Sequence, residues 1–363
     1  MSVQYVKLGD VCAKDSSNIA QKDLKDCFGK YPVYGAGGYI QNVGFYHQED
    51  EYIAIVKDGA GIGRAMILPA KSSVIGTMQY IIPDKNKVDI NYLYYAIINM
   101  ELGKYFSGAT IPHIYFKDYQ KEIFKLPNLK IQKKIADNLK NIDLMIAKKN
   151  KQISLFNELV KSRFIEMFGD PVKNEKNLPL EQLSKIGILE RGKSQHRPRN
   201  APELLGGPYP LIQTGDVSNS NIYITTYSNT YSELGLKQSK LWEPGTLCIT
   251  IAANIAQTAI LTFKACFPDS VVGFIPNNNT NIIFIHYWFE FFQKVLEEQA
   301  PQVAQKNINL KILSELKVIL PSLELQNEFA DFVKQTDKSK LEIQKSLDKL
   351  EILKKSLMQQ YFG

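Results

Sequence analysis

The chain has 363 residues, of which 44% are apolar and 22% charged, and it carries a formal net charge of +7. This length accommodates two domains with their own cores besides long helices, and the apolar content excludes a chain that is disordered throughout. The positive charge is spread thinly, so the composition excludes a uniformly basic protein and requires any cations that bind nucleic acid to be placed locally.

The cysteines and histidines predict neither a metal centre nor an oxidising compartment. The four cysteines and four histidines are scattered without the close spacing of metal ligands, which argues against a zinc site. The N-terminus has no signal-peptide pattern, and no apolar run reaches the length of a membrane span. We therefore expect a cytoplasmic protein with reduced thiols and no membrane partner.

Residues 1–126 predict a first, β-rich globule. Short apolar and β-branched runs bounded by glycine, proline or charge predict strands at 52–56, 64–68 and 78–82, and residues 90–102 predict one helix. Two glycine clusters, at 35–38 and 59–63, do not open helices, so we interpret them as turns and not as phosphate-binding loops.

Residues 127–169 predict one uninterrupted helix. Pro127 stands where a helix can begin, and no further proline or glycine occurs before Gly169. About 40 residues at 1.5 Å each give a length of ~60 Å. Apolar residues recur at alternating spacings of three and four, which is typical of a coiled-coil seam: Leu139, Ile142, Ile146, Ile153, Phe156 and Val160.

A polar segment with two prolines, residues 170–179, predicts a linker to a second globule at 180–320. The second globule repeats the plan of the first with weaker identity. Residues 209–211 echo 31–33, residues 271–273 echo 74–76, and a predicted helix at 282–298 echoes the one at 90–102.

Residues 321–363 repeat 127–169 without a gap, at a constant offset of 194 residues. The second seam is formed by Ile343, Leu347, Leu350 and Leu357. A long helix with an apolar stripe needs a partner, and the second copy of the stripe is the nearest one. We expect the two helices to pair within the chain; the alternative is a coiled coil that joins two chains.

The sequence contains none of the catalytic motifs that we sought. It has no Walker lysine motif, no Gly-x-Ser-x-Gly, no His-Glu-x-x-His, and no Asn-Pro-Pro-Tyr type motif of an amino-methyltransferase. Asp84 and Asp269, each after a proline, are the nearest candidates for a metal-dependent nuclease, and we interpret both Pro-Asp pairs as turns. We therefore predict a chain without catalytic activity of its own.

The order globule, helix, globule, helix, with Leu-Pro-x-Leu-x-x-Gln at both 126–132 and 320–326, resembles the specificity subunit of type I DNA restriction-modification systems. The resemblance covers the whole chain, although the glutamate usual before the glutamine is replaced by Ile131 and Leu325. It implies an α+β fold in which two similar target recognition domains alternate with two long helices that pair as an intramolecular antiparallel coiled coil. Four loops also resemble loops of the family, at 107–114, 191–194, 213–217 and 302–308.

The resemblance implies a DNA sequence-recognition subunit that acts on double-stranded DNA. Each domain would recognise one half of an asymmetric bipartite target, and the helices would fix the spacing. Methylation would come from two modification subunits that bind S-adenosylmethionine, and restriction from motor-nuclease subunits, so the chain itself would bind no cofactor. The alternatives are the recognition part of a fused restriction-methylation enzyme and a coiled-coil scaffold that does not bind DNA.

Candidate DNA ligands are the cations, amides and hydroxyls of the predicted loops, because cations bind phosphates and planar polar groups contact base edges. The densest basic cluster is the loop at 191–199. The candidates in the first globule are Lys57, Arg64, Thr110, His113 and Tyr115. Those in the second are Arg191, Lys193, Gln195, His196, Arg197, Arg199, Gln213, Asn254, Gln305, Lys306 and Asn307.

Overall fold

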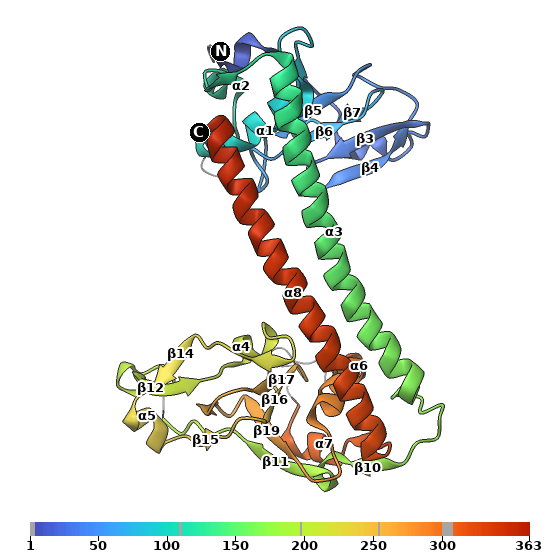
Figure 1. Cartoon of the computed structure of the whole chain (residues 1–363), viewed down its shortest axis with the longest axis vertical. Coiled ribbons are helices and arrows are strands. Elements are labelled where there is room, and N and C mark those ends of the chain that lie inside the picture. The colour runs from blue at the N-terminus through green and yellow to red at the C-terminus, as the bar shows by residue number, and fades with distance from the viewer. Residues whose placement is uncertain (1–3, 109–110, 197, 253–254, 300–307) are drawn as a thin grey trace. The chain divides into compact units, whose positions relative to one another are not determined.

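The computed structural model describes residues 4–108, 111–196, 198–252, 255–299 and 308–363. The chain forms two compact units, of which unit 1 comprises Met1–Lys151 with Gln344–Gly363, and unit 2 comprises Gln152–Ile343. Each unit contains one globule and part of each of the two long helices, α3 (Leu129–Phe168) and α8 (Leu323–Phe362) (Figure 1). Within the described residues, none of the helices combines the length and apolar character that a membrane crossing requires.

In its described residues, the globule of unit 1 has three small sheets and two short α-helices. The first sheet pairs β1 (Gln4–Lys7) antiparallel with β9 (Ile123–Leu126). The second has the order β2 (Cys12–Ser16), β8 (Met78–Pro83), β5 (Tyr52–Val56), β6 (Ala65–Leu68). The third has the order β4 (Gly38–Val43), β3 (Tyr31–Gly35), β7 (Ser73–Val74). The helices are α1 (Ile90–Asn99) and α2 (Phe116–Tyr119).

Unit 2 has the same three kinds of sheet. The first pairs β10 (Leu180–Gln182) antiparallel with β20 (Lys317–Ile319). The second has the order β11 (Gly187–Arg191), β19 (Val271–Pro276), β16 (Leu247–Thr250), β17 (Thr258–Leu261), β13 (Tyr223–Ile224). The third has the order β14 (Asn229–Tyr231), β12 (Leu205–Leu211), β18 (Ala265–Cys266), β15 (Leu241–Trp242). The helices are α4 (Thr214–Ser218), α5 (Glu233–Lys237), α6 (Ile282–Gln299) and α7 (Leu310–Glu315).

The two globules share their strand pairing, but one sequence echo between them was assigned wrongly. The parallel pair β3 and β7 of unit 1 corresponds to the parallel pair β12 and β18 of unit 2. Val74 lies in β7, whereas Val271 begins β19, which is the counterpart of β8. The echo of 74–76 in 271–273 is therefore an error. Two neighbouring apolar strands look alike in sequence, and only their pairing register distinguishes them.

Both long helices begin two residues after their proline, and not at the proline as the sequence suggested. Asn128 caps α3, because its Oδ1 accepts a hydrogen bond from the Ile131 amide at 3.0 Å. Ser322 caps α8, because its Oγ accepts one from the Leu325 amide at 3.4 Å. Each proline therefore precedes a capping residue whose side chain satisfies an otherwise unpaired amide of the first turn.

The repeated glutamine of the Leu-Pro-x-Leu-x-x-Gln motif has a structural role. Gln132 is buried, and its Oε1 accepts a hydrogen bond from the amide of Asp89, the N-cap of α1, at 2.8 Å. Its Nε2 donates to the carbonyls of Pro127 at 2.7 Å and Lys87 at 3.0 Å. The first turn of α3 is thereby fixed to the start of α1.

Gln326 makes the same contacts in unit 2. Its Oε1 accepts from the amide of Asn281, immediately before α6, at 2.9 Å. Its Nε2 donates to the carbonyls of Pro321 at 2.8 Å and Asn279 at 3.3 Å. An amide side chain alone offers both the acceptor and the two donors that this buried position requires. The motif is therefore explained by packing inside each unit.

The apolar stripes of α3 and α8 face each other within both units. In unit 1, Leu139, Ile142 and Leu347 are buried, and Ile146, Leu350 and Leu357 are half-buried. In unit 2, Val160 is buried, and Ile153, Phe156 and Ile343 are half-buried.

Polar contacts between the stripes establish the direction of the pairing. In unit 2, Lys340 donates to Asn157 at 3.2 Å and Arg163 donates to Glu328 at 2.8 Å, so the numbers fall along α8 as they rise along α3. In unit 1, Lys354 pairs with Asp143 at 2.6 Å. The helices are antiparallel.

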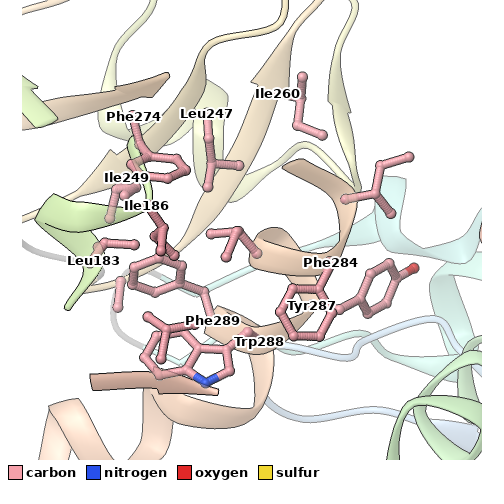
Figure 2. Close-up of a cluster of buried hydrophobic side chains, with 14 of the residues drawn as sticks. Leu183, Ile186, Leu247, Ile249, Ile260, Phe274, Phe284, Tyr287, Trp288 and Phe289 are labelled. Atoms are coloured by element: carbon pink, nitrogen blue, oxygen red, sulfur yellow. The ribbon is translucent and has the colours of Figure 1, made fainter. Parts of the chain in front are cut away.

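Each globule is joined to the long helices by a continuous core. In unit 2, Phe284, Tyr287, Trp288 and Phe289 of α6 lie against Leu247 and Ile249 of β16, Phe274 of β19, and Ile260 of β17 (Figure 2). Phe164 of α3 stacks on Phe284 with ring centroids 5.6 Å apart. Burial of one such aromatic side chain contributes roughly 2–3 kcal/mol, so α6 attaches the sheet firmly to α3 and α8.

The core of unit 1 is arranged similarly, with Tyr92 of α1 against Phe362 of α8 at a ring separation of 5.0 Å. The helix predicted at 90–102 ends earlier, at Asn99. Glu101 adopts the left-handed conformation with φ of 49°, which stops the helix, and a separate turn of 3-10 helix covers Leu102–Tyr105.

Candidate nucleic-acid interface

Two of the predicted loops of unit 1 lie side by side. Ser107 and His113 exchange backbone hydrogen bonds at 2.9 and 3.0 Å, which join the two ends of the loop at 107–114. The carbonyl of Pro112 accepts from the amide of Gly59 at 2.9 Å, and the amide of Ile114 donates to the carbonyl of Lys57 at 3.0 Å. The loops at 59–63 and 107–114 are thus joined, which brings Lys57 and His113 together.

Asp58 binds both of these predicted DNA ligands. Its carboxylate accepts from Lys57 Nζ at 2.8 Å and contacts His113 Nδ1. Burial raises the pKa of Asp58, but the two basic partners outweigh that effect and hold the pKa below its usual value. The carboxylate is therefore ionised at neutral pH, and it orients Lys57 and His113 while neutralising part of the charge of Lys57.

These residues border a cavity of about 460 Å³ whose rim is basic. Lys14, Lys57 and Lys117 all line it, together with His113 and Tyr115. The Tyr115 ring lies 4.0 Å from the His113 ring, and Lys117 Nζ lies 5.1 Å from the centroid of Tyr115. Three ammonium groups around an exposed aromatic ring offer both phosphate ligands and a stacking surface.

Sequence reasoning missed Lys14 and Lys117. Each is a single lysine in its own stretch of sequence, on β2 and α2 respectively, so no local pattern distinguishes it. Arg64, in contrast, was predicted but does not line this cavity; its Nε bonds to the Gly61 carbonyl at 3.4 Å.

The basic loop of unit 2 is anchored from both sides. The amides of Gln195 and His196 donate to Gln238 Oε1 at 2.7 and 3.0 Å. Arg199 pairs with the Asp269 carboxylate at 2.6 Å, and Arg191 Nε donates to the Asp269 carbonyl. Asp269 lies in a turn, as predicted, and it also holds two of the predicted arginines.

A second acidic residue balances the lysines beside this loop. Glu190 pairs with Lys240 and lies 3.9 Å from Lys193. Lys240 Nζ also lies 4.0 Å from the centroid of the Trp242 ring. In the described part of the loop, Gln238 therefore holds the backbone, and Glu190 and Asp269 pair with its basic side chains.

Gln213 lies apart from these ion pairs and precedes α4. Its amide donates to Asp216 at 2.8 Å, and its Oε1 accepts from Asn229 at 3.4 Å. The remaining predicted ligands lie outside the described residues: Thr110, Arg197, Asn254, Gln305, Lys306 and Asn307.

The acidic residues of the described ranges do not gather into a metal site. No group of three or more histidine, cysteine, aspartate or glutamate side chains within those ranges has the arrangement of metal ligands.

Comparison with known proteins gives one consistent result. The family model for the type I restriction modification DNA specificity domain matches residues 2–155 and 176–353. The type I restriction enzyme MjaVIII specificity subunit of Methanocaldococcus jannaschii is 26% identical over 338 residues, which cover 84% of this chain and 77% of that protein. A protein described as the MjaX specificity subunit of the same organism is 26% identical over 298 residues, covering 76% and 68%.

Solved structures share the fold. The crystal structure of a type I restriction-modification S subunit from M. genitalium matches with a TM-score of 0.66 at 17% identity, covering 100% of this chain and 96% of that one. A chain from a structural study of complex assembly and conformational transition of the type I system matches with a TM-score of 0.59 at 14% identity, covering 99% and 97%.

Proposed function

The chain belongs to the type I restriction-modification DNA specificity family, and from this membership we propose that it is the subunit that recognises a bipartite DNA target. The recognition domains are 1–126 and 180–320, the helical regions are 127–169 and 321–363, and 170–179 is the linker. The domain at 1–126 recognises one half of the target, and the domain at 180–320 recognises the other half.

The observation that carries this proposal is that one fold occurs twice with different recognition loops. Ile114 bonds to the Lys57 carbonyl in unit 1, and Ile308 bonds to the Ile251 carbonyl in unit 2 at the same distance of 3.0 Å. A lysine beside a basic cavity thus corresponds to an isoleucine, and the densest basic loop of unit 2 has no counterpart in the sequence of unit 1. The two globules therefore share their backbone arrangement but differ in the side chains that could contact DNA, as expected if they bind two different half-sites.

The long helices offer a surface for protein partners. Leu144 and Met145 of α3 are 50% and 51% exposed, and Ile352 and Leu353 of α8 are 70% and 46% exposed. The ion pair of Lys354 with Asp143 places these four side chains at one level of the antiparallel pair. Exposed large apolar side chains are typical of protein interaction sites, and we assign these four residues of the helix pair, called the helical patch, to a modification subunit.

Catalysis belongs to the partners. Two modification subunits bind S-adenosylmethionine and transfer the methyl group, and restriction subunits complete the assembly. This chain supplies no catalytic residue and binds no cofactor.

The test is reconstitution. The purified chain alone is expected to transfer no labelled methyl group from S-adenosylmethionine to DNA, and addition of the cognate modification subunit is expected to restore transfer at a bipartite sequence. Replacing residues 1–126 with the corresponding domain of a relative should change one half of the methylated sequence. Methyl transfer by the isolated chain would support a fused enzyme instead, and the absence of salt-dependent DNA binding would support a scaffold protein.

A further inference from the structure

Unit 2 contains a small polar cavity that the recognition function does not use. It has a volume of about 180 Å³ and is bounded by α3, the turn after α4, the residues that enter β17, and α6. Its lining includes Lys161, Asn221, Gln257, His286 and Glu290. None of these residues belongs to the basic loop at 191–199.

Unit 1 has a cavity at the equivalent place. In unit 1, the amide of Gly63 donates to the carbonyl of Val56 at 2.9 Å. In unit 2, the amide of Ala256 makes the corresponding bond to the carbonyl of Thr250 at 2.8 Å. Arg64 therefore corresponds to Gln257. Counting from the capping residues Asp89 and Asn281, two helix positions also correspond, Tyr94 with His286 and Ile98 with Glu290. The same count pairs Glu101, which follows the end of α1, with Gln293 of α6.

The comparison shows that the fold does not require a carboxylate at one position of this lining. The cavity of unit 1 is lined by Gly63, Arg64, Ala65, Ile98 and Glu101, and that of unit 2 by the counterparts of all five. Where unit 1 has Ile98, unit 2 has Glu290, and burial raises the pKa of that carboxyl group. Neighbouring residues desolvate this carboxylate only in part, because its side chain is 37% exposed. A ligand in the cavity can therefore reach a carboxylate at a position where unit 1 has an isoleucine.

The polar groups combine a carboxylate, an ammonium and a buried imidazole. Lys161 Nζ lies 3.8 Å from Glu290 Oε2, with both side chains partly exposed at the entrance. His286, only 3% exposed, bonds through Nδ1 to Thr258 Oγ1 at 2.8 Å and lines the cavity. Burial lowers the pKa of His286 to about 4, so its imidazole is neutral at pH 7.

We propose that this cavity binds the Watson–Crick edge of a guanine base. Guanine presents two N–H donors that a carboxylate accepts together, as Glu290 offers, and beside them O6, which an ammonium group such as Lys161 binds. Adenine presents an acceptor where guanine presents its ring N–H, and it has no oxygen for Lys161. The base could come from a free guanine nucleotide or from an unpaired guanine in DNA.

The experiment measures binding of GMP to the full chain by isothermal titration calorimetry, without DNA or partner subunits. We expect GMP to bind at least tenfold more tightly than AMP. Glu290→Gln and Lys161→Met should each weaken GMP binding at least tenfold, because both side chains are partly exposed and their replacement leaves the fold intact. Glu101→Gln, the matched change in the cavity of unit 1, should leave binding unchanged.

Two results would overturn the proposal: no measurable binding of GMP, or equal binding of GMP and AMP. A competition experiment identifies the source of the base. It measures whether bound GMP is displaced by a DNA duplex with a single unpaired guanine or by one with a single unpaired adenine. Displacement of GMP by the guanine duplex alone supports a site for DNA guanine, and displacement by neither supports a site for a free nucleotide. Since the titration contains no modification subunit, its failure leaves the proposed recognition function untouched.

Discussion

At the scale of single residues, the candidate interface contains basic side chains that are paired with acidic neighbours. Asp58 holds Lys57 and His113, and Asp269 holds Arg199. Such a pair positions the basic side chain, but the carboxylate reduces the net positive charge that the pair offers to a phosphate. The lysines without a carboxylate at this site therefore matter most for phosphate binding, and in unit 1 these include Lys14 and Lys117, which share the cavity rim with Lys57.

We predict that the double substitution Lys14→Ala and Lys117→Ala weakens DNA binding and reduces its salt dependence. Each lost phosphate contact lowers the slope of log K against log salt by ~0.9, so the pair should lower it by ~2. Fluorescence anisotropy with a target duplex over a range of salt concentrations measures the slope. Lys85→Ala is the control, because Lys85 pairs with Asp50 and does not line the cavity. An unchanged slope in the double variant would exclude this cavity as a phosphate site.

His286 should make unit 2 sensitive to acid. Its folded pKa of about 4 lies below the ordinary value of 6.5, so the unfolded state binds more protons between these values. The contribution of the neutral His286 to the free energy of unfolding is complete above pH 6.5 and is lost as the pH falls toward 4. One pKa unit corresponds to about 1.4 kcal/mol, so the loss between pH 7.5 and 5 should be about 2 kcal/mol.

The measurement is urea unfolding followed by tryptophan fluorescence at both pH values. Both tryptophans, Trp242 and Trp288, belong to unit 2, so the signal reports on that unit. His286→Gln should remove the loss that His286 causes. Glu290 acts in the opposite sense, because its raised pKa stabilises the folded state at low pH, and it remains in both proteins. Equal pH dependence in the two proteins would contradict the prediction.

At the scale of elements, each long helix is attached to its globule by a glutamine and by an apolar stripe. Gln132 and Gln326 connect the first turns of α3 and α8 to the starts of α1 and α6. The prolines, caps and glutamines of the two motifs together determine where each helix begins. The same sequence motif therefore marks the same joint in both units.

We predict that Gln326→Leu destabilises unit 2 by about 3 kcal/mol, because an unsatisfied buried polar group costs roughly 1–3 kcal/mol and the Asn281 amide and the Pro321 carbonyl both lose their partner. Tryptophan-monitored urea unfolding measures the change. Gln152→Leu, at an exposed position of α3, is the control and should shift stability little. A similar effect of both substitutions would show that the contacts of Gln326 contribute nothing specific.

The helical patch makes a different prediction, because its side chains are exposed. Leu144→Ala with Leu353→Ala should weaken binding of the modification subunit at least tenfold while leaving the unfolding free energy within about 0.5 kcal/mol. Leu139→Ala, at a buried position of the same helix, should instead cost about 2–5 kcal/mol of stability. Calorimetric titration with the modification subunit and thermal unfolding separate the two effects. Unaltered subunit binding by the first variant would remove the patch from the interface.

At the scale of the whole molecule, the proposed function makes the helix length a determinant of the target spacing. Removing one heptad from each helix, residues 147–153 and 341–347, preserves the seam register. Seven residues at 1.5 Å shorten each helix by ~10 Å. A base pair of DNA rises ~3.4 Å, so the unread spacer should contract by about three base pairs.

Methylation mapping of the double deletion checks this prediction. Both half-sites should stay the same while the spacer shortens. Three base pairs also rotate one half-site by roughly 100° at ~10.5 base pairs per turn, so loss of activity is a second outcome consistent with a spacing role. Methylation at the original spacing would show that the helices do not set the distance.

The sequence by itself determined the duplication, the two long helices, their apolar seams and the family. Each of these features can be recognised from residues that are close in sequence or that repeat at one constant offset. The sequence identified only part of the candidate site in unit 1, because it missed Lys14 and Lys117. Lys14, Lys57, His113 and Lys117 meet only through pairing of strands and loops distant in sequence. Likewise, Val271 could be assigned to β19 only from its pairing register. Periodicity is a local property, whereas a cavity is lined by residues that the tertiary fold alone brings together.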